Sequence, residues 1–126
     1  MRRIILSGEG KENNEKLFIA VFVGVLTLLS EKAIDIEEAE NYLLSPYTAE
    51  ALKVFSINER IAELVLYACE LEDIESLMPE KLESVISKIL YELIQICKKS
   101  DKPALPTKKW VDCKKFEPSD SVILET

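Results

Sequence analysis

The segment from Leu17 to Leu29 constrains the fold more than any other part of the chain, because its thirteen residues read LFIAVFVGVLTLL and carry no charge. As a helix it would span about 20 Å, which is short of the ~30 Å hydrocarbon core of a bilayer. Charged residues flank it, and no small-residue cleavage site closes it as in a signal peptide. The segment therefore predicts a buried core helix over about residues 13–32, capped by Asn13 or Asn14, with no membrane contact. Gly24 in its middle indicates either a close crossing by another helix or simple tolerance.

Capping signals divide the following residues into four further helices. Three places combine a capping residue with a helix-starting partner: Asp35 with Glu38, Ser45 with Pro46, and Ser56 with Glu59. Pro79 suits the first position of a further helix. The expected helices cover 36–44, 46–55, 57–71 (with an extension to 77 left open) and 79–99. Together with the first helix they predict a mainly all-α, compact bundle of about five helices, in a single domain over residues 1–126.

Apolar spacing predicts which face of each helix is buried. Tyr42 is expected on the inner face of the second helix, and Ala51, Leu52 and Phe55 on that of the third. The fourth helix has a longer stripe, made of Ile57, Ile61, Leu64, Val65, Ala68 and Leu71. The last helix has the most regular apolar stripe, made of Leu82, Val85, Ile86, Ile89, Leu90, Leu93, Ile94 and Cys97. The four tyrosines are interpreted as core-edge aromatics, and any exposed member is a candidate anchor for a partner.

The pattern changes after residue 99, so the helical core is expected over about 13–99 and a tail over 100–126. Pro103, Pro106 and Pro118 exclude a long helix in this tail. Residues 2–6 and 122–124 could form strands that join the termini in a short β-ribbon. The alternative is an irregular tail that packs Trp110 against the bundle.

Missing residue types exclude several kinds of chemistry. The chain has no histidine and three glycines, so a histidine triad, a histidine metal site, a histidine pH switch and a glycine-rich phosphate loop are all excluded. Cys69, Cys97 and Cys113 are odd in number and widely spaced, which favours reduced, apolar cysteines in a cytoplasmic protein. Cys113, beside two lysines, is the one electropositive thiol. We expect no enzyme and no cofactor.

Acidic residues are concentrated in the middle of the chain. The net charge is -7, but residues 35–97 hold 14 acidic and 4 basic residues, whereas residues 98–126 hold 5 acidic and 7 basic ones. Such acidity argues against nucleic-acid binding, which needs clustered Lys and Arg. One acidic run supplies the candidate partner-binding face, made of Glu70, Glu72, Asp73 and Glu75.

Three classes of function remain open. The leading hypothesis is a non-enzymatic protein–protein interaction module with a basic partner, for example an immunity or inhibitor protein that masks a cationic active site. Clustered carboxylates could instead hold Mg²⁺ or Ca²⁺ in a metal-binding protein or enzyme. The third class is a transcription regulator, because residues 35–55 have the outline of a helix-turn-helix. Lys53 is, however, the one basic side chain on the second helix of this motif. A homodimer is plausible under each, because a 126-residue monomer can hardly cover so apolar a first helix.

Three short stretches resemble a small family of uncharacterised bacterial proteins. They are Ala39-Glu40-Asn41-Tyr42-Leu43-Leu44-Ser45-Pro46-Tyr47-Thr48, Glu70-Leu71-Glu72-Asp73 and Pro79-Glu80-Lys81-Leu82. The resemblance covers about residues 17–97 and leaves the tail outside. It implies an all-helical, bacterial, cytosolic protein, and it assigns no functional residues.

Overall fold

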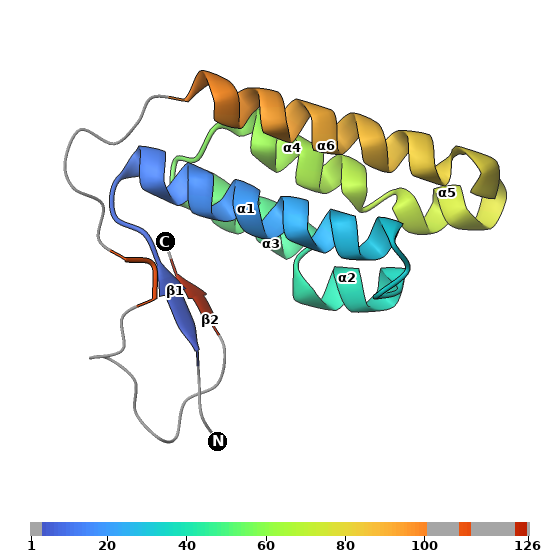
Figure 1. The fold of residues 1–126 in the computed structure, drawn as a ribbon, viewed down its shortest axis with the longest axis horizontal. Coiled ribbons are helices and arrows are strands. Elements are labelled where there is room, and N and C mark those ends of the chain that lie inside the picture. Colours follow the sequence, from blue (N-terminus) through green and yellow to red (C-terminus); the bar gives the residue numbers. More distant parts are fainter. Residues whose placement is uncertain (1–3, 101–108, 112–122, 126) are drawn as a thin grey trace.

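The computed structural model describes residues 4–100, 109–111 and 123–125, and it confirms the mainly all-α class (Figure 1). The described part contains six α-helices and one 3₁₀ turn. Their bounds are α1 Lys11–Ser30, α2 Ile36–Tyr42, α3 Pro46–Val54, α4 Glu59–Ala68, α5 Leu71–Leu77, the turn η1 Pro79–Lys81, and α6 Leu82–Lys99.

The helices pack around a core to which α1, α4, α5 and α6 contribute the largest fully buried side chains. In Figure 1, α1 crosses the middle of the bundle, with α6 and α4 along one side and α2 at its C-terminal end. α3 packs chiefly against α4. The largest fully buried side chains are Leu17, Phe22, Leu26, Ile61, Val65, Leu71, Ile86, Ile89 and Leu93. Burial of this apolar surface is the main force that holds the bundle together.

α1 is a core helix, as its sequence predicts, but one of its faces is open. Eight of its residues are buried, and Phe18 packs edge-to-face on Phe22 with ring centroids 5.9 Å apart. By length and composition alone α1 could cross a membrane. Of its apolar 18-residue stretch, 39% is buried in the bundle. Gly24 is exposed, and a Cβ built there would meet no atom within 4 Å, so no described segment crosses α1 closely at this point.

Two of the predicted caps are confirmed and two are wrong. The Asp35–Glu38 capping box and the Ser45 N-cap are both present. The predicted Ser56–Glu59 box is absent, because Ser56 has a left-handed backbone with φ 55° and lies before the helix. Asn58 is the N-cap of α4 instead, and its side chain accepts a hydrogen bond from the Arg60 N–H at 2.9 Å. α1 likewise begins at Lys11, after Gly10, rather than at an asparagine cap.

The expected fourth helix is divided in two, which gives six α-helices instead of about five. The Cys69 and Glu70 N–H groups donate to Leu66 and Tyr67 carbonyls three residues back, at 3.2 and 3.0 Å. This tightening ends α4, and the chain turns before Leu71 restarts as α5 with its side chain 1% exposed. Pro79 begins η1 rather than α6, so the last helix starts at Leu82.

The buried faces agree with the sequence for α4, differ at one position for α2, and differ for α3. All six residues of the predicted α4 stripe are buried. Tyr42 and Phe55, both expected inside, are 62% and 50% exposed. The buried side chains of α3 are Ala49 and Leu52, so this helix is rotated relative to the predicted face. On α6, Ile94 is also more exposed than its spacing predicts.

A short parallel ribbon joins two distant segments of the chain. Strand β1, Ile5–Ser7, pairs with β2, Ile123–Glu125, in the register Ile5 to Ile123. An antiparallel bridge between Leu6 and Val111 lies beside it, and the Ser7 N–H donates to the Trp110 carbonyl at 3.1 Å. Of the two alternatives for the chain ends, the structure therefore confirms the β-ribbon for the described residues. Cys113 lies outside the described residues, whereas Cys69 and Cys97 are half-buried free thiols.

Candidate functional site

Two adjoining hollows, each of about 360 Å³, are lined mainly by charged side chains. Both are lined by Asp35 and Glu75, so they join into one depression between α2, α5 and the start of α6. We call this depression the acidic groove. Seven carboxylates and one ammonium group line it: Asp35, Glu37, Glu38, Glu40, Glu72, Glu75, Glu83 and Lys32.

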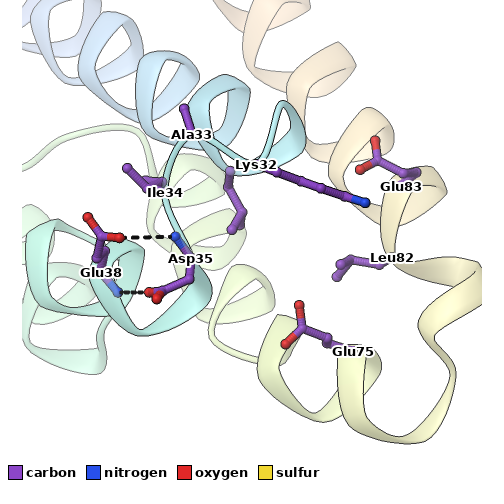
Figure 2. A pocket seen from close by; sticks show the side chains of 9 residues that line it. Lys32, Ala33, Ile34, Asp35, Glu38, Glu75, Leu82 and Glu83 are labelled. Carbon is purple, nitrogen blue, oxygen red and sulfur yellow. Dashed lines mark hydrogen bonds between the residues drawn. The ribbon is translucent and has the colours of Figure 1, made fainter.

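The turn between α1 and α2 sets one end of the groove. The Lys32 N–H donates to the Leu29 carbonyl at 3.0 Å and the Ala33 N–H to the Leu28 carbonyl at 2.9 Å, which is the Schellman pattern that ends a helix. Lys32 holds the left-handed position, with φ 60°, that glycine usually occupies. Its side chain extends from α1 toward the first turn of α6, where Glu83 lies (Figure 2).

Hydrogen bonds fix three of the groove carboxylates. Asp35 Oδ1 accepts from the Glu38 N–H at 2.8 Å, and the Asp35 N–H donates to Glu38 Oε1 at 3.4 Å (Figure 2). The Tyr42 hydroxyl donates to the other Glu38 oxygen at 3.2 Å, and this bond raises the pKa of Tyr42. Across the groove, Ser30 Oγ donates to Glu83 at 2.8 Å and ties the end of α1 to α6. The capping box therefore orients part of the site as well as starting α2.

Repulsion between α2 and α5 is concentrated at Glu40. Partial burial, a side-chain hydrogen bond with Glu72, and the negative charges of Glu72 and Glu37 all raise the pKa of Glu40. Burial and the charges of Glu40 and Glu70 also raise the pKa of Cys69, which keeps that thiol protonated and a poor nucleophile. The site consequently favours any ligand that brings positive charge.

The structure places half of the predicted acidic face in the groove. Glu72 and Glu75 line it, whereas Glu70, directly before α5, and Asp73, on α5, are exposed and do not. Sequence reasoning missed the α2 contribution, although its signal is present. Residues 35–40 read DIEEAE and residues 70–75 read ELEDIE, which is the same order of acidic and apolar positions. In both runs the apolar residues face the core, which leaves the acidic ones nearer the surface. All four acidic residues of the first run and two of the four in the second line the groove.

Neutralising Glu40 is expected to stabilise the protein at neutral pH. Because the folded pKa of Glu40 is raised, its ionisation costs stability, and this cost disappears when the pH falls below the unfolded value near 4.5. Glu40→Gln should therefore raise the free energy of unfolding at pH 7 by about 0.5 kcal/mol. Denaturant titrations at pH 7 and at about pH 3.5 measure the difference. Glu12→Gln, on the exposed first turn of α1, is the control, and a gain that persists at low pH would contradict the electrostatic explanation.

The other two hypotheses gain no support from this geometry. Within the described residues, no group of three or more Asp, Glu or Cys side chains is arranged to hold a metal ion. On α3, the one basic side chain, Lys53, forms an ion pair with Glu50 at 3.3 Å. The helix that would read DNA therefore presents a neutralised charge.

Comparison with known proteins gives a family and no activity. The model of the family described as "Protein of unknown function (DUF3969)" matches residues 9–112. No curated protein and no solved structure matches the chain. The resemblance to an uncharacterised family is thus confirmed, over a wider range than residues 17–97.

Proposed function

The chain belongs to DUF3969, a family of unknown function, and from its acidic groove we propose that it is a non-enzymatic interaction module that binds a basic protein partner. One observation carries the proposal: seven carboxylates from α2, α5 and α6 surround one continuous depression that holds a single lysine. Half of the 14 acidic residues between 35 and 97 are gathered there.

Repulsion between these carboxylates favours a ligand that carries positive charge. Like charges held on facing helices destabilise the free protein, and Glu40 and Glu72 experience this most directly. Lysine or arginine side chains inserted between α2 and α5 would remove the repulsion and form charge-assisted hydrogen bonds. The surrounding negative potential would also accelerate encounter with a basic partner.

The size of the groove suits single side chains that a partner inserts into it better than contact with a flat protein surface. Each hollow of about 360 Å³ can take one or two long basic side chains. The finer form of the proposal is an inhibitor or immunity protein, in which the groove receives basic residues from the active site of a toxin and masks them. In that case binding alone inactivates the partner, and this chain needs no catalytic residue.

Chemical-shift mapping with two matched peptides tests the proposal. One is an amphipathic helix with lysines at i and i+4, and the other has glutamate at the same positions. The lysine peptide should shift the amide signals of residues 35–40, 72–75 and 83, and the effect should weaken as salt is raised. The glutamate peptide should shift none of these signals. Salt-independent binding of the lysine peptide, or shifts confined to other helices, would overturn the proposal.

A further inference from the structure

The outer face of α3 is apolar although it points away from the core. Tyr47 is 82% exposed and Val54 78% exposed, and they lie seven residues apart on one side of the helix. Half-buried Ala51 lies between them, and Phe55, 50% exposed, follows directly. The buried residues Ala49 and Leu52 are on the opposite side. We call Tyr47, Glu50, Ala51, Val54 and Phe55 the α3 outer face.

Such a face usually serves an interface. Exposed apolar side chains are common singly, but a group on one helix face indicates that something covers it. α3 packs against α4 through its other side, and in Figure 1 it lies behind α1. Tyrosine is also among the residues that most often anchor interfaces.

Charge narrows the choice of what covers this face. The α3 outer face carries Glu50, which forms an ion pair with the neighbouring Lys53 at 3.3 Å, so it is locally neutral. The acidic groove would attract a basic partner, whereas a neutral face gives such a partner no advantage. Two copies with a net charge of -7 each repel one another, and they can meet only where the local charge is balanced.

We propose that the α3 outer face is the contact between two copies of this chain in a twofold-symmetric dimer. With the two α3 helices antiparallel and the axis passing between Glu50 and Ala51, Tyr47 of each copy lies opposite Val54 of the other. These two residues are about 10.5 Å apart along the helix, so both pairs are buried at once. Glu50 and Lys53 can then pair across the axis, at the rim of the apolar contact.

The dimer is expected to be weak and independent of the acidic groove. A helix of nine residues with its flanking side chains gives less than the roughly 800 Å² per partner of a standard interface. The proposal does not rest on the proposed function, because the groove is formed by other helices and stays open to a basic partner. Dissociation constants of about 10–100 μM fit a contact of this size.

Sedimentation equilibrium of three single variants tests the interface. The full chain should pass from monomer to dimer between about 1 μM and 1 mM. Val54→Lys and Tyr47→Lys should each weaken dimerisation by at least about tenfold, because each places a charge in an apolar contact. Leu77→Lys is the matched control, since Leu77 is 77% exposed but lies at the end of α5, and it should dimerise as the native chain does.

Folding and alternative contacts are controlled in the same series. Thermal unfolding at low concentration should be nearly unchanged in all three variants, because the replaced side chains are exposed. A chain that stays monomeric over the whole range would overturn the proposal. So would a dimer that Val54→Lys leaves intact, which would place the contact elsewhere, for example on the open face of α1.

Discussion

Charge reversal of Glu72 and Glu75 is expected to weaken binding of the lysine peptide by at least about a hundredfold. Each replacement removes one attractive contact in the groove and adds one repulsive contact, and about 1.4 kcal/mol per site gives this factor. Fluorescence anisotropy of the labelled peptide, at fixed and low ionic strength, measures the loss.

Glu70 and Asp73 provide a matched control on the same short helix. The double variant Glu70→Lys/Asp73→Lys changes the net charge by the same amount, but neither residue lines the groove. Its affinity should therefore stay within about threefold of the native value, through long-range electrostatics alone. If the two double variants lose affinity equally, net charge rather than the groove controls binding, and the proposed site is wrong.

Replacement of Glu15 by alanine is expected to cost about 2 kcal/mol of stability. Glu15 is the one buried charged residue in the described part of the chain, at 7% exposure. Its carboxylate accepts a hydrogen bond from the Asn58 N–H at 3.0 Å and thereby joins α1 to the start of α4. A hydrogen bond to a charged group contributes about 1.5–3 kcal/mol, and Glu15→Ala removes it. Chemical denaturation should show a lower midpoint with an unchanged slope.

Two further variants separate the hydrogen bond from other effects. Glu15→Gln keeps an acceptor oxygen at nearly the same place, so it should lose less than half as much stability as Glu15→Ala. Glu12→Ala, one turn earlier and exposed, should change stability by less than about 0.5 kcal/mol. Equal losses for Glu15→Ala and Glu12→Ala would mean that helix propensity or the helix dipole, and not this contact, explains the result.

Local signals predicted most of the helices, because they depend on neighbours a few residues away. The Asp35 and Ser45 caps and the buried stripe of α4 follow from spacing alone. The α4–α5 break has no proline or glycine to mark it, so the sequence reads as one helix there. The predicted buried face of α3 is wrong because Ala51 and Phe55 fit the apolar spacing as well as Ala49 does. Packing against α4 selects between these two faces.

Two of the four residues predicted for the candidate site line the groove, and the reason is similar. Glu72 and Glu75 stood out as part of an acidic run, but so did Glu70 and Asp73, which point elsewhere. The run at residues 35–40 has the same pattern, yet nothing in the sequence indicates that it faces residues 70–75 across a groove.

The sequence alone accounts for the composition and the local structure of this protein. It set the all-α class, the apolar first helix, the excess of carboxylates and the absence of histidine chemistry, because these follow from residue type and short-range spacing. The packing of the helices selects which carboxylates meet, brings Glu15 to the start of α4, and leaves Tyr47 and Val54 outside. The first two outcomes depend on contacts between segments some 30 to 45 residues apart, and the third depends on the packing of α3 against α4. The packing of the whole core selects all three.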